Sequence, residues 1–286
     1  MIRNVIPGRH LGMEQSHPLR QVIPDPPNES LRLVPIQHLT SGGRWRATAM
    51  RSYRMPIMMW LTRGQGRITI AGTTSGFGAH NAIFLPPRTM HGFESISQLF
   101  GTAIYFGTGQ DLPDQTLHFR IRDVMEQAEL NALIETITRE QNADRLARDK
   151  ALMHYCGLLS VWLERQQTQP NPVRIAPQSA VNLAARFTAL VEDQLFTGQN
   201  ISDYAEALGV TPTHLSRVCR ETCGRPASEI LADRITFEAR RLLIETKLPV
   251  RRVAEVLGFN SSAYFTRAFR ARTGLTPSEF RLQPLR

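Results

Sequence analysis

The chain has 286 residues, of which 42% are hydrophobic and 21% charged, and its formal net charge is +9. That length predicts two folded domains, and the composition is typical of a globular protein rather than a disordered or fibrous one. The longest uncharged apolar run, residues 55–61, is far shorter than the ~18 residues that span a membrane. Without a signal-peptide core, and with three scattered cysteines, the chain is expected to be cytoplasmic. The positive charge favours nucleic acid as a partner.

The first part of the chain predicts an extended arm and then a β domain. Residues 1–35 contain six prolines, which is typical of an extended segment. Residues 36–122 contain short strand-like runs marked by glycine or proline: 67–70 alternates polar and apolar residues, and 82–85 and 103–106 are apolar. Short strands at turn-marked intervals predict a small β-sandwich or barrel.

Residues 123–167 predict two helices, because apolar side chains recur there at helical spacing. The two stripes are Leu130, Leu133, Ile134 and Ile137, and Leu152, Cys156, Leu159 and Leu163. One stripe is expected to pack on the β domain and the other to meet a second subunit, which would make the protein a homodimer. Residues 168–178 contain three prolines and are expected to be the interdomain linker.

Residues 179–286 contain an internal repeat, with copies at 201–224 and 250–274. Each copy has apolar residues at i, i+3, i+4 and i+7, then a glycine, Gly209 or Gly258, and then a helix-start signal. The second helix of each copy stops at Gly224 or Gly274. This order predicts two helix-turn-helix units.

Residues 227–246 contain no glycine or proline and predict a helix that joins the two units. At 1.5 Å per residue this helix is a rod of about 30 Å, close to the ~34 Å turn of B-DNA. The two second helices are therefore expected to enter successive major-groove segments on one face of a duplex.

The residues of the repeat also form a recognisable pattern. It comprises Leu215, Arg217, Gly224, Arg234, Ala239, Leu242, Leu243, Gly258, Phe259, Tyr264, Phe265, Arg267, Phe269, Arg270, Gly274, Thr276, Pro277, Phe280 and Arg281. This pattern resembles the AraC/XylS family of transcription regulators, with Cys219 standing where the family more often has phenylalanine. The resemblance implies promoter-specific DNA binding, usually with activation of transcription by RNA polymerase, and a cupin-like sensor domain in front.

The second helix of each unit has a core face and an opposite face that is expected to touch DNA. The candidates are Thr213, Ser216, Arg217 and Arg220 in the first unit, and Ser262, Ala263, Thr266, Arg267 and Arg270 in the second. The resemblance implies base contacts at Thr213, Ser216, Arg217, Ser262, Ala263 and Arg267, and arginine can bind guanine O6 and N7. For Arg217 and Arg267, a phosphate contact or an intramolecular salt bridge is the alternative. Phosphate contacts are expected from Arg220, Arg270, Arg272 and Arg281.

The interior of the β domain is a candidate effector site, because a small barrel can enclose a ligand. The candidate lining residues are Trp60, Phe84, His91 and Tyr105, although these side chains could equally fill a solid core. The arginines of this region favour an anionic effector, but the same charge would also help to hold DNA. Because His80, His91 and His118 do not form a set of metal ligands, no metal or other cofactor is expected.

These features predict an α+β protein: a cupin-like β-sandwich or barrel, two helices, and an all-α double helix-turn-helix domain. The expected function is effector-controlled regulation of transcription, with double-stranded promoter DNA and RNA polymerase as partners and no enzymatic activity. One alternative is an effector-independent regulator whose front domain serves only for assembly. A less favoured alternative is a cupin enzyme that carries a DNA-binding tail.

Overall fold

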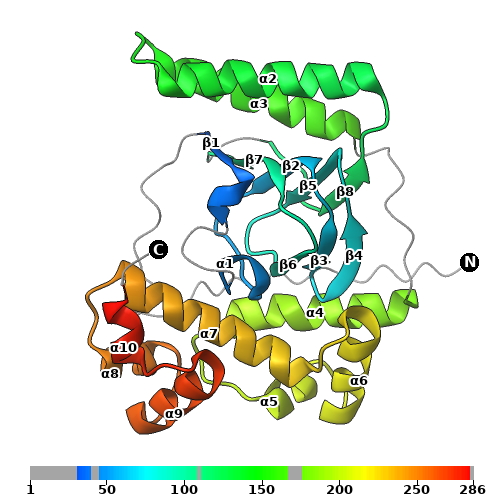
Figure 1. Cartoon of the computed structure of the whole chain (residues 1–286). Helices are drawn as coiled ribbons and strands as arrows, with labels where there is room; N and C mark the ends of the chain where they lie inside the picture. Colours follow the sequence, from blue (N-terminus) through cyan, green and yellow to red (C-terminus); the bar gives the residue numbers. More distant parts are fainter. Residues whose placement is uncertain (1–30, 40–44, 108–110, 167–175, 284–286) are drawn as a thin grey trace, which may run out of the picture.

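The computed structural model describes residues 31–39, 45–107, 111–166 and 176–283 (Figure 1). It confirms the α+β class: β-strands occupy the centre, helices α2 (Val124–Asn142) and α3 (Arg148–Gln166) cover one side, and the C-terminal helices lie on the opposite side. In the described part of the chain, no helix is long and apolar enough to cross a membrane.

The strands form two antiparallel sheets. The larger sheet has the order β1-β7-β2-β5-β8, built from β1 (Arg32–Pro35), β7 (Phe100–Tyr105), β2 (Ile57–Arg63), β5 (Asn81–Leu85) and β8 (Leu117–Arg120). The smaller sheet has the order β4-β3-β6, built from β4 (Thr73–Phe77), β3 (Gly66–Ile70) and β6 (His91–Ser95). Strand β1 pairs with β7, with Arg32 opposite Tyr105. The predicted arm, residues 1–35, therefore extends too far, because its last residues belong to the sheet.

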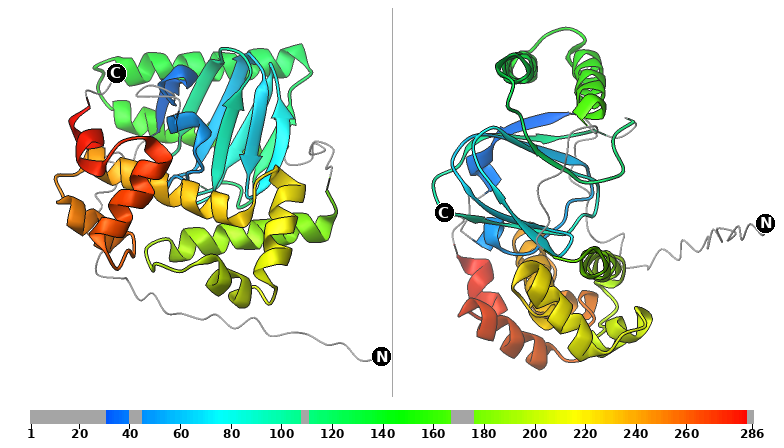
Figure 2. Two further views of the ribbon diagram at one scale, coloured as in Figure 1. Left: turned by 60° about the horizontal axis from the view of Figure 1, so that its bottom comes forward. Right: turned by 90° about the vertical axis from the view of Figure 1, so that its right-hand side faces the viewer.

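Both faces of the larger sheet are buried, which explains why its central strands are continuously apolar. Successive side chains of a strand point to opposite faces, so Met58 and Trp60 pack toward α2 and α3. Ile57 and Met59 pack instead against the smaller sheet. The right-hand view of Figure 2 shows this order, with α2 and α3 above the strands and the C-terminal helices below.

Helices α2 and α3 bury both of their predicted apolar stripes in one core with the sheet. Leu130 on α2 and Leu159 on α3 are fully buried beside Phe84 and Phe119. Asp123 caps α2 by accepting hydrogen bonds from two backbone N–H groups of its first turn. The expectation that one of these stripes meets a second subunit is therefore wrong, because the sheet covers both.

The C-terminal helices confirm the two helix-turn-helix units and the helix that joins them. They are α4 (Gln178–Gln194), α5 (Ile201–Ala207), α6 (Pro212–Cys223), α7 (Ala227–Glu245), α8 (Val250–Val256), α9 (Ser262–Thr273) and α10 (Pro277–Leu282). The hydroxyls of Thr211 and Ser261 cap α6 and α9, and Gly224 and Gly274 end these helices in the left-handed conformation. The short helix α1 (Trp45–Thr48) lies between the β domain and this helical domain.

Candidate nucleic-acid interface

Helices α6 and α9 lie on the side of the molecule opposite α2 and α3 (Figure 1). Each buries one face in the core of its own unit: Leu215 and Cys219 of α6, and Phe265 and Phe269 of α9, are at most 3% exposed. The opposite faces are open to solvent. Exposed there are Thr213, Arg217, Arg220, Ser262, Ala263, Arg267 and Arg270, and half-buried are Ser216 and Thr266. All nine predicted DNA-contacting residues therefore lie on accessible faces, and their contact with DNA stays a prediction.

The two units differ in how their arginines are held. In the first unit, Arg217 lies 3.5 Å from the carboxylate of Glu221 and donates a hydrogen bond of 3.2 Å to Nδ1 of His214. The intramolecular alternative thus applies to Arg217 in the unbound protein. In the second unit, Arg267 and Arg270 form no ion pair within the described residues. The second unit consequently presents the less compensated positive charge to a phosphate backbone.

Arg281, which is expected to contact a phosphate, binds backbone carbonyls in the unbound protein. Its Nε donates to the carbonyl of Leu243 at 3.2 Å, and its Nη2 donates to the carbonyl of Leu248 at 2.5 Å. Both acceptors lie at the end of α7 or just beyond it, where helix carbonyls lack partners in the helix. Arg281 therefore stabilises the end of α7, and its contact with phosphate stays a prediction.

Cys219 occupies the core position that corresponds to Phe269 in the second unit. It is fully buried among the side chains of the first unit, and burial raises its pKa to about 12. Burial also raises the pKa of Cys223, one helical turn later. Both thiols are therefore protonated at neutral pH and pack as small apolar groups.

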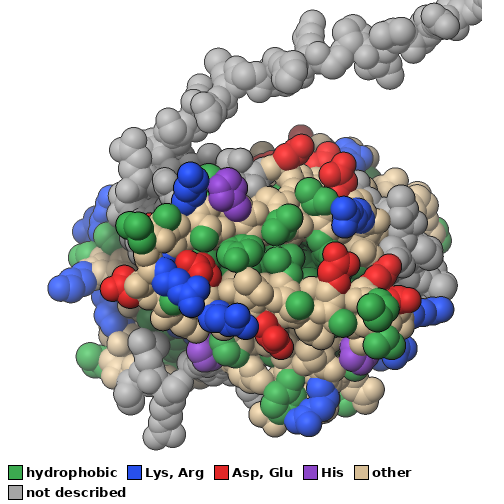
Figure 3. Space-filling view, turned by 90° about the horizontal axis from the view of Figure 1, so that it is seen from above, with side chains coloured by type: hydrophobic (Ala, Val, Ile, Leu, Met, Phe, Trp, Pro, Cys, Tyr) green, Lys and Arg blue, Asp and Glu red, His purple; other side chains and the backbone are tan. Residues whose placement is uncertain are grey.

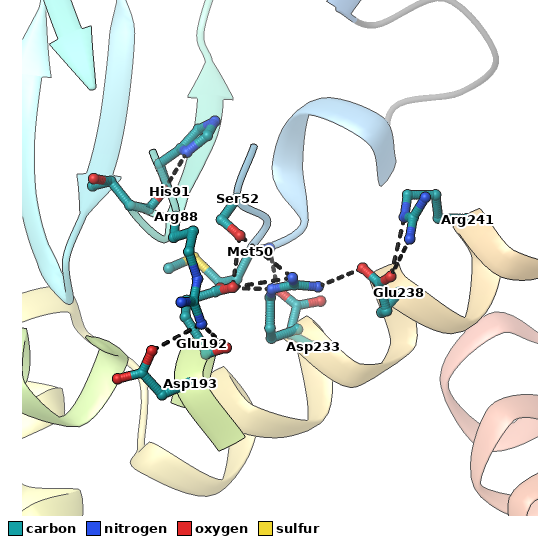
Figure 4. Close-up of polar contacts among 11 residues, drawn as sticks. Met50, Ser52, Arg88, His91, Glu192, Asp193, Asp233, Glu238 and Arg241 are labelled. Carbon is teal, nitrogen blue, oxygen red and sulfur yellow. Dashed lines mark hydrogen bonds and ion pairs between the residues drawn. The ribbon is translucent and has the colours of Figure 1, made fainter. Parts of the chain in front are cut away.

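Buried polar side chains join the β domain to the DNA-binding domain (Figure 4). Arg234 on α7 binds both oxygens of Glu192 on α4, at 2.7 and 3.1 Å, and Glu238 at 3.0 Å. From the β domain, the hydroxyl of Ser52 donates to Glu192 at 2.6 Å. The backbone N–H of Met50 donates to Asp233 at 3.0 Å. Hydrogen bonds from the β domain and a buried ion pair between α4 and α7 thus link the two domains.

The pKa values at this junction follow from burial and pairing. Burial alone would lower the pKa of Arg234, but the carboxylates of Glu192 and Glu238 raise it above its ordinary value. Burial alone would raise the pKa of Glu238, but Arg234 and Arg241 lower it. The arginine and the carboxylate are therefore both charged at neutral pH, and each side chain depends on its partner.

A second contact holds the β domain against the other helix-turn-helix unit. The ring of Trp45 on α1 lies 5.7 Å from the ring of Phe237 on α7 and 6.0 Å from that of Phe280 on α10. The guanidinium of Arg240 stacks over Trp45 at 4.9 Å. The β domain therefore contacts both units, through Ser52 beside the first and through Trp45 beside the second.

The four predicted effector-binding residues do not share one cavity. Trp60 and Phe84 lie on the sheet face that packs against α2 and α3, where Trp60 donates a hydrogen bond to Asn131. Tyr105 belongs to the core between the two sheets, and its ring meets that of Tyr53 edge to face; Tyr53 also packs on His91. The predicted set is corrected accordingly, because strand alternation places its members on opposite faces of the sheet.

His91 is the most polar side chain left in the predicted effector set. Burial and the nearby charge of Arg51 lower its pKa to about 3, so the ring is neutral at physiological pH. Its Nδ1 donates to the carbonyl of Thr89 at 2.9 Å, which leaves Nε2 as an acceptor. That buried Nε2 has no hydrogen-bond partner among the described residues.

A cavity of about 310 Å³ lies between the turn that joins β5 to β6 and helix α4. Arg88 on its wall binds Asp193 of α4 at 2.8 Å and the carbonyl of Glu192 at 2.9 Å.

Within the described ranges, no group of three His, Cys, Asp or Glu side chains is placed to hold a metal ion.

The sequence predicted which residues of α6 and α9 are accessible to solvent, but it did not predict the junction between the domains. The signal available for it was a charged residue, Arg234, at a helical position otherwise occupied by apolar residues such as Ile230 and Leu231. A charge on such a stripe indicates a buried partner. Its partner, Glu192, belongs to another helix, and no local pattern connects the two.

Two helix-turn-helix units that lie side by side along α7, each with an exposed arginine-bearing helix, define a DNA-binding protein of the double helix-turn-helix class. The protein-family model described as a helix-turn-helix domain matches residues 204–283 of this chain. The transcriptional activator AarP of Providencia stuartii is 35% identical over 92 residues, which are 32% of this chain and 68% of AarP. The chain belongs to the AraC/XylS family of transcription regulators.

Other similarities are more limited in extent or in identity. The arabinose operon regulatory protein of Escherichia coli is 33% identical over 82 residues, 29% of this chain and 28% of that protein. The chain thus spans less than a third of the length of that relative. Among solved structures, ToxT from Vibrio cholerae aligns with 89% of this chain and 98% of its own, at 13% identity and a TM-score of 0.39.

Proposed function

We propose that the protein is a sequence-specific transcription regulator and that a small-molecule effector bound in residues 36–122 controls it.

 The proposed role is activation of transcription in the cytoplasm, with double-stranded promoter DNA and RNA polymerase as partners. The observation that supports DNA binding best is the pair of capped helices α6 and α9, whose exposed faces carry Arg217, Arg220, Arg267 and Arg270. Positive side chains at the surface of such helices neutralise phosphates, and arginine also binds guanine edges.

The test of DNA binding is selection of bound sequences from a random duplex library by the full chain at ~0.15 M salt. Two short enriched motifs about one helical turn apart, ~10–10.5 bp, are expected if both units contact the major groove. Binding that only falls with salt and enriches no motif would contradict sequence-specific recognition.

Arg267 offers the sharpest single substitution, because it is exposed and forms no ion pair within the described residues. Arg267→Ala is expected to weaken binding to the selected duplex by about 1–3 kcal/mol and to relax the preference at one base pair. Arg145→Ala removes an exposed positive charge just before α3, on the opposite side of the molecule, and is the control for a general loss of charge. Equal losses in the two variants would contradict a specific role for Arg267.

The effector proposal now centres on His91 and Tyr105, in the core between the two sheets. The buried, unpartnered Nε2 of His91 supports it, because a ligand hydroxyl or amide could donate to that atom. The test is thermal unfolding in the presence of a panel of small sugars, alcohols and carboxylates. An effector at 100 times its Kd stabilises the fold by about 2.7 kcal/mol. His91→Gln should remove that stabilisation, and a panel without any stabilising compound would favour the effector-independent alternative.

The junction at Glu192 supports control of the DNA-binding domain by the β domain. Ser52 of the β domain and Arg234 of the DNA-binding domain bind the same carboxylate, so a movement of either side changes the contacts of the other. An effector that favours one arrangement of this junction would shift the population of the DNA-competent form.

We propose that the protein is a homodimer whose interface is the outer face of α3 rather than either predicted stripe. The two predicted stripes are buried, but the outer face of α3 leaves Met153, Leu158 and Val161 43–55% exposed. Figure 3 looks onto this side of the molecule and shows apolar side chains gathered near its centre. Leu158→Glu is expected to convert a dimer into a monomer in analytical ultracentrifugation, because it places a charge in the apolar interface. A wild-type protein that is monomeric at tens of micromolar would contradict the proposal.

A further inference from the structure

The two helix-turn-helix units touch each other directly through two glycines. Gly198 lies between α4 and α5, and Gly258 lies in the turn between α8 and α9. A Cβ atom built on Gly258 would lie 2.3 Å from the backbone nitrogen of Gly198 and 2.4 Å from its Cα. A Cβ atom on Gly198 would lie 2.4 Å from the carbonyl oxygen of Gly258. The two backbones therefore approach more closely than any side chain would permit.

The close approach distinguishes Gly258 from its counterpart in the first unit. Gly209 occupies the same turn of the repeat and has nearly the same φ, +71° against +76° for Gly258. Yet no described heavy atom lies within 4 Å of a Cβ built on Gly209. The turn alone accounts for Gly209, whereas Gly258 also serves a contact with the other unit.

A shared aromatic side chain lies next to this contact. Phe196 packs against the core of the first unit, which contains Phe187 and Leu215, and against the core of the second, which contains Phe265 and Phe269. The units are thus joined at two places: by helix α7, and by the contact of Gly198 with Gly258. Two points of attachment restrict the rotation of one unit relative to the other about α7, whereas a single connecting helix would allow it.

We propose that the Gly198–Gly258 contact sets the relative position of α6 and α9, and hence the spacing of the two DNA motifs that the protein accepts. The inference rests on the proposed DNA-binding function. Two linked units gain about 100-fold to 10,000-fold in affinity when both engage one molecule, and lose this gain when geometry prevents it. At about 10.5 bp per turn, one base pair rotates the next motif by about 34° around the duplex, so small changes in the unit arrangement matter.

A side chain at either glycine must separate the two turns. To restore an ordinary contact of 3.4 Å, a Cβ on Gly258 would have to move about 1 Å from the backbone of Gly198. Backbone atoms cannot rotate away as the tip of a flexible side chain can. The substitution therefore shifts the second unit as a body.

The experiment measures the affinity of the full chain for three kinds of duplex taken from the selection: both motifs at the selected spacing, both motifs with one base pair added or removed, and one motif with the other scrambled. The variants are Gly198→Ala, Gly258→Ala and, as the matched control, Gly209→Ala. The control carries the same left-handed backbone strain without the contact. Thermal unfolding of each variant checks that it is folded.

For Gly198→Ala and Gly258→Ala we expect the affinity for the two-motif duplex at the selected spacing to fall at least tenfold. This loss is part of the roughly 100-fold or greater gain in affinity that linkage of the two units provides. Affinity for the single-motif duplex should stay unchanged, and Gly209→Ala should keep both affinities. Wild-type affinity and spacing preference in both contact variants would overturn the inference, as would an equal loss in Gly209→Ala. A wild-type protein that binds no selected motif would instead refute the proposed function, and this inference with it. If Gly258→Ala does not fold, Gly198→Ala alone decides the outcome.

Discussion

Replacing Glu192 by glutamine removes one negative charge from the junction between the β domain, α4 and α7. Glutamine has nearly the same shape, so the change tests charge rather than packing. The side chains of Glu192 and its partner Arg234 are only 5% and 6% exposed, so water cannot replace the lost carboxylate. Arg234 retains one buried partner, Glu238, at 3.0 Å.

Removing one partner of a buried ion pair costs about 3–5 kcal/mol of stability, because the other charge is left without compensation. Since Arg234 keeps Glu238 and glutamine still offers one acceptor oxygen, we expect the lower end, about 3 kcal/mol. The control is the adjacent Asp193→Asn. Asp193 pairs with Arg88 of the β domain, but these side chains are 63% and 43% exposed. Loss of an exposed pair costs about 0.2–1 kcal/mol.

Urea unfolding followed by tryptophan fluorescence measures both changes, because Trp45 packs directly on α7 and Trp60 reports on the β domain. A difference of less than about 1 kcal/mol between Glu192→Gln and Asp193→Asn would refute the reasoning. It would mean that solvent or another charge compensates Arg234 in the folded protein.

Other predictions concern pH and helix capping. Burial lowers the pKa of His118 to about 4, so the unfolded chain binds a proton below pH 6.5 that the folded protein excludes. Stability should therefore fall between pH 6.5 and 4, by up to about 1.4 kcal/mol per pH unit for this group. In urea unfolding at several pH values, His118→Gln should reduce the dependence of the unfolding free energy on pH. The part of that dependence that comes from His91, whose pKa is also lowered by burial, should remain. A variant with the same pH dependence as the wild type would contradict the prediction. Thr211→Ala should destabilise the protein by about 1 kcal/mol, because it removes the cap of α6. Thr213→Ala, exposed on the same helix, should change stability by less than about 0.5 kcal/mol; equal effects in thermal unfolding would argue against the cap.

The sequence by itself determined the features that depend on neighbouring residues. The two helix-turn-helix units follow from helical spacing and from local end signals: the caps Thr211 and Ser261, and the glycines Gly224 and Gly274. The outward faces of α6 and α9 follow as well, because burying Leu215 or Phe265 leaves only the opposite face for solvent. Such features act over a few residues and can be identified without knowing the rest of the fold.

Only the tertiary structure decided which distant segments meet. Trp60 and Tyr105 both belong to apolar strands, but the sequence does not show which face of the sheet each side chain occupies. In the structure they lie on opposite faces, so the residues predicted to line one effector site are separated. Arg234 finds Glu192 42 residues away. Gly198 and Gly258 meet only where the two units pack against each other. These contacts depend on packing between elements far apart in the chain. The spacing of apolar residues within one element does not show which residues of another element it will contact.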